Sequence, residues 1–182
     1  MKLNPIHFSK DHNVEFYKEL KQRVNDYFKS NNINRYANGK MYAKTVAMIL
    51  LYFVPYTLIL TVADNYLFAF AMWILAGVGM AGIGMSIMHD ANHGSYSKNK
   101  YVNTALGFLI NIVGGSDVNW RIQHNVLHHT YTNVDGYDED IEVGGLMRFS
   151  PHQPRFKAHK YQHLYAWFLY GLLTINWFFR KD

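Results

Sequence analysis

The chain has 182 residues, a formal net charge of +5 and a pI of about 9.3. It contains no cysteine, which excludes thiolate zinc sites and iron–sulfur clusters held by the protein. Hydrophobic residues make up 49% of the sequence but the mean hydropathy is only −0.16, so apolar residues are concentrated in segments. A basic chain suits nucleic acid or an anionic membrane surface. Because no nucleic-acid-binding signature is present, the apolar segments favour a membrane protein with no nucleic-acid partner.

Residues 1–44 are polar and basic, with nine Lys or Arg against four Asp or Glu. Apolar side chains recur in this segment at steps of three and four residues, namely Val14, Tyr17, Leu20, Val24 and Phe28. This spacing predicts an amphipathic helix. Two interpretations stand: a cytosolic helix lying on the membrane surface, or a helix packed on its own domain. No apolar core precedes residue 45, so we expect no cleavable signal peptide.

Two uncharged segments follow, and together they predict a transmembrane hairpin over residues 45–88. Thr45–Ala63 and Tyr66–Met88 contain 19 and 23 residues without a charge. At about 1.5 Å per residue, each helix can cross a hydrocarbon core of about 30 Å. Small residues let membrane helices approach closely. Four glycines in the second segment are candidates for that contact: Gly77, Gly79, Gly82 and Gly84.

The charges around the hairpin predict its orientation. Residues 1–44 and 89–161 carry nine and seven Lys or Arg, so the positive-inside rule places both flanks in the cytosol. The next apolar segment, Tyr101–Ser116, has only 16 residues. A third span there would place His124 across the membrane from His89. We therefore expect an interfacial or re-entrant helix that returns to the same side.

Two histidine clusters flank this short segment. The first reads His89-Asp-Ala-Asn-His93 and the second reads His124-Asn-Val-Leu-His128-His129. Residues four apart share one face of a helix, so each cluster points two imidazoles the same way, with His129 one step around. Neutral imidazole is the commonest side-chain metal ligand. Five imidazoles exceed the needs of one tetrahedral zinc, and Asp90 replaces the glutamate of a zincin helix, so a multi-iron site fits better.

The amino-acid sequence around both clusters resembles the first two histidine boxes of membrane fatty-acid desaturases. The stretches concerned are His89-Asp-Ala-Asn-His93-Gly-Ser-Tyr-Ser and Trp120-Arg-Ile-Gln-His124-Asn-Val-Leu-His-His129-Thr-Tyr-Thr-Asn133. They are most similar to the front-end, linoleoyl-CoA or delta-6-type branch. The resemblance implies a non-haem di-iron centre on the cytosolic face, with His89, His93, His124, His128 and His129 as ligands. It also implies O2 as oxidant, a fatty acyl-CoA or acyl-lipid substrate, and desaturation of the acyl chain.

The resemblance has one large departure. The family has a third box, His or Gln followed two or three residues later by His-His, and no stretch before Asp182 matches it. We therefore expect the N-terminal half of a longer desaturase, inactive by itself. Residues 1–44 lack the His-Pro-Gly-Gly motif of a fused cytochrome b5, so we expect a separate electron donor of ferredoxin or cytochrome b5 type.

The predicted fold is an all-α integral membrane helical bundle in one incomplete domain, residues 1–182. Its parts are a cytosolic amphipathic segment (1–44), the transmembrane hairpin (45–88), a cytosolic histidine-box region with an interfacial helix (89–160) and a third membrane segment (161–182). The last apolar stretch runs from Leu164 to Phe179. His159 and His163 repeat the four-residue spacing at its start, where interfacial anchoring is the favoured interpretation over metal binding.

Other residues near the clusters have two interpretations each. Asp138 and Asp140 are candidates for carboxylates that orient imidazoles, although each also fits a solvated acidic loop. Trp120 either lines the acyl path or simply packs. The basic residues of the 145–160 loop suit either an acidic electron carrier or acyl-CoA phosphates, or else the anionic leaflet: Arg148, Arg155, Lys157 and Lys160.

Two alternative functions remain open at this stage. A membrane di-iron hydroxylase or carotenoid ketolase shares the histidine pattern and is separated from a desaturase by its product. The other alternative is an inactive, truncated membrane fragment that cannot hold two irons; the iron content of the purified chain distinguishes it from a desaturase.

Overall fold

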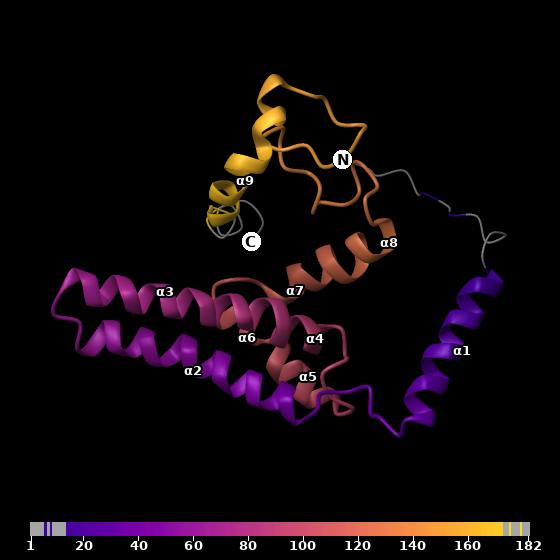
Figure 1. The fold of residues 1–182 in the computed structure, drawn as a ribbon, viewed down its shortest axis with the longest axis horizontal. Coiled ribbons are helices and arrows are strands. Elements are labelled where there is room, and N and C mark those ends of the chain that lie inside the picture. Colours follow the sequence, from indigo (N-terminus) through magenta and orange to yellow (C-terminus); the bar gives the residue numbers. More distant parts are fainter. Residues whose placement is uncertain (1–5, 7, 9–13, 173–174, 176–178, 180–182) are drawn as a thin grey trace.

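The computed structural model describes residues 6, 8, 14–172, 175 and 179, and within them every regular element is helical (Figure 1). The longer helices are α1 (Val14–Ser30), α2 (Gly39–Thr61), α3 (Tyr66–Gly82), α5 (Lys100–Gly107) and α9 (Gln162–Gly171). The shorter ones are η1 (Ile83–Met88), α4 (His89–Asn92), α6 (Leu109–Ile112), α7 (Asp117–Trp120), η2 (Arg121–His128), α8 (His129–Tyr131) and η3 (Lys157–Tyr161). The predicted all-α class is confirmed for this part of the chain.

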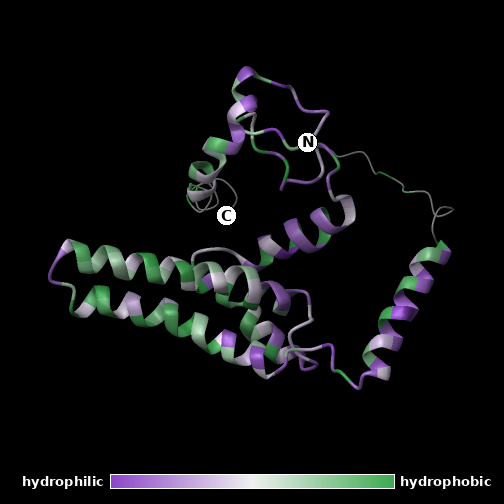
Figure 2. Cartoon of the chain, in the orientation of Figure 1, coloured by the Kyte–Doolittle hydropathy of each residue, from purple (hydrophilic) through white to green (hydrophobic). Residues whose placement is uncertain are grey.

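Helices α2 and α3 form the predicted antiparallel hairpin. Asn38 and Asn65 begin them, because each side-chain oxygen accepts a hydrogen bond from a backbone N–H of the first turn. Two continuous helices, Gly39–Thr61 and Tyr66–Asn92, are long and apolar enough to cross a membrane. Only 11% and 17% of their most apolar windows are buried within the protein, whereas the core helix of a soluble protein is mostly buried. Figure 2 shows apolar residues along most of both helices.

Glycine brings the two hairpin helices together at two positions. A Cβ added at Gly79 would lie 2.7 Å from the Leu51 carbonyl carbon, and one at Gly82 would lie 2.7 Å from the Met48 Cγ. The predicted close approach is confirmed for these two glycines, whereas a Cβ added at Gly77 or Gly84 would have nothing within 4 Å among the described residues. The latter two therefore face away from α2.

The segment after the first histidine cluster folds back against one end of the hairpin. The predicted stretch 101–116 is broken into α5 and α6, which pack against η1 and α4 at one end of the hairpin. Neither helix is long enough to span a membrane by itself, which favours the predicted interfacial or re-entrant helix over a third span. The small buried core lies at this end: Met88, Ile110 and Trp120 form one cluster, beside fully buried Ile83 and Ile87.

Tyr96, just after the first cluster, ties this end of the molecule to α2. Its hydroxyl lies 2.8 Å from Thr45 Oγ1, and its carbonyl accepts the Ala37 N–H at 3.0 Å. Both Tyr96 and Thr45 are buried, so the hydrogen bond is shielded from solvent. The loop that enters α2 is thereby held beside the histidine region.

Helices α1 and α9 lie at the two ends of the described chain. Helix α1 confirms the predicted amphipathic helix; it buries none of its residues and stands apart from the hairpin in Figure 1. Helix α9 covers the beginning of the predicted third membrane segment. Most of the remainder, 173–174, 176–178 and 180–182, lies outside the described residues.

Candidate metal centre

The first histidine cluster sits at the end of the second hairpin helix. Helix α3 continues through η1, a π-helical stretch, into α4, which carries His89 and leads into His93. The His93 N–H donates to the His89 carbonyl at 3.1 Å, and the two ring centroids are 4.5 Å apart. The four-residue spacing thus places both imidazoles together, as predicted.

The second cluster starts from a braced turn. Ser116 accepts the Asn119 N–H and begins α7. Asp117 accepts from Asn111 Nδ2 at 3.0 Å and forms an ion pair with Arg121. These contacts join the end of α6 to the helix that carries the second cluster, and so direct that helix toward the first cluster.

A π-helix determines how the second cluster points. In an α-helix a residue five positions on is rotated by about 140°. A π-turn closes i→i+5 hydrogen bonds and so holds more residues per turn. In η2 the residues four and five positions after His124 therefore fall on either side of one face. His128 and His129 have ring centroids 5.1 and 4.9 Å from that of His124.

The five predicted histidines converge into one group. His124 lies at its centre, with ring centroids 5.1 Å from both His89 and His93. His93 also lies 4.8 Å from His129. Trp120 stacks on His124 at 4.5 Å, with the ring planes 26° apart. Side chains 31 or more positions apart in sequence thus meet beside the end of the hairpin.

The environment of His124 suits a metal ligand. Its Nε2 is buried and has no hydrogen-bond partner. Burial first, and then the neighbouring imidazoles, lower the pKa of His124 to about 4. Burial and the rings of His89 and His129 also lower the pKa of His93. At neutral pH these imidazoles are uncharged, which is the form that binds metal.

A buried carboxylate stands behind His128. Asp138 is 0% exposed, and its two oxygens lie 3.0 and 3.1 Å from His128 Nδ1. Its oxygens also accept the backbone N–H groups of Asn133 at 2.8 Å and Asp140 at 3.1 Å. Burial pushes the pKa of Asp138 upward, but these three donors outweigh it and leave the pKa lowered. The carboxylate therefore stays charged and leaves Nε2 of His128 open.

Two sets of side chains have ligand atoms within 4.8 Å of one another: His89, His93 and His124, and His124, His128 and Asp140. The donors are imidazole nitrogen and carboxylate oxygen, which suit iron. With the unpaired Nε2 of His124, this chemistry fits a metal. Asp140, the other acidic candidate, has its Oδ2 3.3 Å from His128 Nδ1. Its carboxylate thus reaches the same imidazole as Asp138.

Two other predicted residues are occupied elsewhere. His159 accepts the Phe156 N–H at its Nδ1, while its Nε2 lies 2.9 Å from the Gly145 carbonyl oxygen. Arg148, a candidate for docking a carrier, donates to the carbonyls of Gln153 and Pro151. Both side chains hold the 145–162 loop together, and both ring nitrogens of His159 are engaged there.

The sequence analysis missed two asparagines between the clusters. Asn125 Nδ2 donates to the Asn92 carbonyl at 3.0 Å and links η2 to α4 directly. Asn125 Oδ1 is buried and without a partner. Each asparagine lies inside a histidine motif, next to a histidine, and that position is the signal that could have identified them.

Comparison with known proteins matches the sequence of this chain to one family. The profile of the family described as fatty acid desaturase matches residues 64–182. The chain is 37% identical over 164 residues to an sn-1 linoleoyl-lipid 6-desaturase of Arthrospira platensis, over 90% of this chain and 45% of the relative. It is 40% identical over 181 residues to an acyl-lipid (8-3)-desaturase of Physcomitrium patens, over 97% of this chain and 37% of the relative.

A third relative, an sn-1 linoleoyl-lipid 6-desaturase of Synechocystis sp., is 34% identical over 163 residues, or 90% of this chain and 45% of the relative. The chain therefore spans less than half the length of these three relatives. Among solved structures none matches.

Proposed function

This chain belongs to the fatty acid desaturase family, and we propose that it forms the hairpin and first two histidine clusters of an O2-dependent acyl desaturase. The observation that carries the proposal is the convergence of five imidazoles from α4 and η2–α8 at one end of an apolar hairpin. A purely structural role requires neither five converging imidazoles nor a buried ring nitrogen without a partner.

The proposed iron ligands are those converging side chains: His89, His93, His124, His128 and His129. When bound, two irons would supply the oxidation by O2 that takes two hydrogens from an acyl chain and leaves a double bond. The chain's own part is to hold the ligands and, for His93 and His124, to lower the pKa of the imidazole so that it is neutral. Asp138 fixes the orientation of His128 through Nδ1. Buried Met88, Ile110 and Trp120 keep water from one side of the group.

The proposed substrate is an acyl chain carried on a lipid. The relatives are named for acyl-lipid or linoleoyl-lipid desaturation, which favours a lipid over an acyl-CoA. An acyl chain in the bilayer would reach the histidines along the hairpin, and Trp120, stacked on His124, is the proposed wall of that path. A separate ferredoxin or cytochrome b5 type of protein would deliver the electrons.

The proposed placement puts α2 and α3–α4 across a membrane, with the histidines at the cytosolic face. The support is the length of the two helices, their exposed apolar surface and the Lys and Arg on both flanks. Two irons also need more donors than five imidazoles supply. We therefore propose that a third histidine cluster from further sequence completes the site.

A graft into a relative tests this function. Residues 1–182 would replace the matching part of the Synechocystis desaturase, and the fatty acids of the expressing cells would be analysed by gas chromatography and mass spectrometry. We expect a new double bond in lipid-bound acyl chains, and its loss with His128→Ala in a graft that still inserts. An alcohol in place of the alkene would indicate a hydroxylase. Unchanged activity with His128→Ala would refute the ligand assignment.

A further inference from the structure

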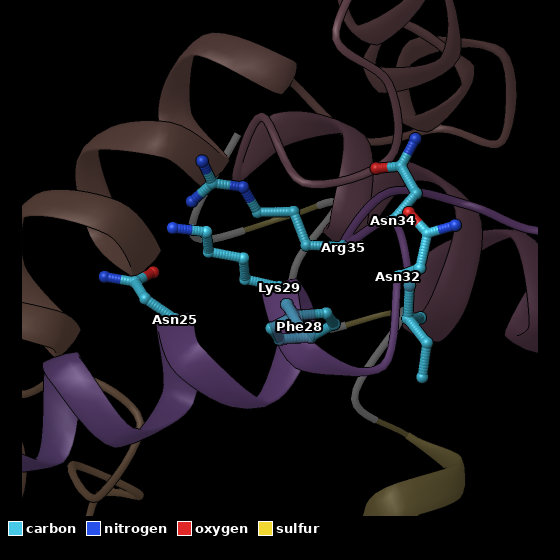
Figure 3. A pocket seen from close by; sticks show the side chains of 7 residues that line it. Asn25, Phe28, Lys29, Asn32, Asn34 and Arg35 are labelled. Atoms are coloured by element: carbon cyan, nitrogen blue, oxygen red, sulfur yellow. The ribbon is translucent and has the colours of Figure 1, made fainter.

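A polar pocket that no histidine lines lies between the end of α1 and the loop that leads into α2 (Figure 3). It has a volume of about 480 Å³. Its lining includes Asn25, Phe28, Lys29, Asn32, Asn34 and Arg35. Figure 3 shows the ends of Lys29 and Arg35 and the amide of Asn25 on one side of the α1 ribbon. Two cations and an amide thus converge on one space.

The pocket is positively charged because no carboxylate lines it. Within the described chain, Lys29 has no ion pair, and Arg35 contacts only the Tyr36 ring, 5.9 Å from its centroid. Arg35 also borders a smaller pocket that contains Asp90, whose Oδ1 lies 3.3 Å from His89 Nδ1. Asp26 precedes Lys29 by three positions on α1 and does not line the pocket. The lining itself therefore carries two positive charges and no negative one.

Helix α1 presents an apolar face beside this pocket. At about 100° per residue, Tyr17, Leu20, Val24 and Phe28 share one side of the helix. Tyr17 is 65% exposed, and no residue of α1 is buried. The acidic residues Glu15, Glu19 and Asp26 fall on the opposite side of the helix. Asn25 and Lys29 lie at the boundary between the apolar and acidic sides, where a membrane-bound helix meets the headgroups.

The short connection to α2 limits how far the pocket can lie from the membrane surface. Arg35 precedes Gly39, the first residue of α2, by four positions, and α2 is the first of the two helices able to cross a membrane. Four residues reach at most about 14 Å. If α2 crosses the bilayer, the pocket therefore lies at or near the headgroup layer.

We propose that this pocket binds the phosphate group of an anionic membrane phospholipid. The Arg35 guanidinium offers paired donors that match phosphate geometry, Lys29 adds a point charge, and the asparagine amides can donate further hydrogen bonds. Such binding holds α1 on the bilayer surface beside the hairpin. The proposal rests on membrane insertion of α2 and not on iron or desaturation.

The test is binding of short-chain lipids to the full chain in neutral detergent at 0.15 M salt. The probes are dihexanoyl phosphatidic acid, dihexanoyl phosphatidylcholine and inorganic phosphate, and the readout is a dissociation constant from isothermal titration. The pocket variant is Lys29→Gln with Arg35→Gln. The matched control is Lys18→Gln with Lys21→Gln, which removes the same charge from the same segment outside the pocket.

We expect the anionic lipid to bind and the pocket variant to weaken binding roughly 30-fold, as two interfacial cations predict. The control should change it less than about threefold, because Lys21 is some 12 Å along α1 from Lys29, beyond the screening length of about 8 Å. Lys29→Arg with Arg35→Lys should retain binding.

Four results would overturn the proposal. Equal losses in the pocket and control variants would indicate general charge attraction. Inorganic phosphate that binds as tightly as the lipid would indicate a soluble phosphate site. Absence of phosphatidic acid binding, or equal binding of phosphatidylcholine, would remove the site altogether. None of these readouts depends on desaturase activity, so failure here leaves the proposed function standing.

Discussion

The carboxylate of Asp138 offers the sharpest test of the histidine site. It is fully buried, and it joins one imidazole to two backbone N–H groups. Asp138→Asn keeps the size of the side chain but replaces one oxygen with a donor. Whichever oxygen is lost, the N–H of Asn133 or of Asp140 faces that donor instead of an acceptor. His128 keeps one weaker, uncharged hydrogen bond.

The magnitudes follow from these contacts. A buried donor left without its acceptor costs about 1–3 kcal/mol, which should loosen the 133–140 loop. Carboxylates behind a metal-binding imidazole affect metal affinity by about 10- to 100-fold. Asp140 Oδ2 remains 3.3 Å from His128 Nδ1 and can replace part of the interaction. We therefore expect about a 10-fold loss for Asp138→Asn and nearly 100-fold when Asp140→Asn is added.

The assay is titration of the purified chain with Co²⁺, an air-stable substitute for Fe²⁺, followed by visible absorption. Hydrogen exchange of residues 133–140 reports the loop separately. Asp135→Asn is the matched control, because this exposed side chain lies in the same acidic stretch and loses the same charge. Unchanged Co²⁺ affinity in Asp138→Asn, or an equal loss in Asp135→Asn, would refute the role given to Asp138.

Three further predictions concern topology, helix packing and metal content. Single cysteines at Ser97 and Ser116 should react with an impermeant thiol reagent from the same side of oriented vesicles. Labelling from opposite sides would contradict a site shared by the two histidine clusters. Gly79→Ala should destabilise the hairpin by about 1–3 kcal/mol in detergent unfolding, because its Cβ meets the α2 backbone, whereas Gly77→Ala should be neutral or slightly stabilising. The chain by itself should bind at most one iron and form no alkene, since five imidazoles are too few for two irons; two irons in elemental analysis would contradict this.

The hairpin and the pairing of imidazoles within each cluster could be predicted because their causes are local. An uncharged run of 19 or 23 residues has few stable environments other than a bilayer. A four-residue spacing fixes the relative direction of two side chains on any α-helix. The ring centroids of His89 and His124 are 5.1 Å apart, so the intervening segment returns to the same end of the hairpin, as expected.

Properties that depend on distant contacts could not be predicted. The sequence ranks Asp138 and Asp140 alike, yet only Asp138 is buried, because the loop folds its backbone donors around that carboxylate. Likewise, the sequence alone does not distinguish Gly79 from Gly77 as a helix contact. Their difference arises from the rotation of α3 against α2, which the helix pattern alone does not specify.

The orientation of His129 shows how a distant contact changes a local rule. An ideal α-helix would turn this ring about 140° away from His124, and the sequence alone predicts a side chain one step around. The π-turns of η2 instead bring the two ring centroids within 4.9 Å. Within η2, Asn125 bonds the Asn92 carbonyl, so the widened helix is tied to the first cluster. Since π-turns are rare and concentrate at functional sites, a His-x-x-x-His-His motif presents three imidazoles on one face only where tertiary contacts hold that extra width. The spacing selects the proposed ligand residues, and the contact between the two clusters accompanies the turn that brings His129 beside His124.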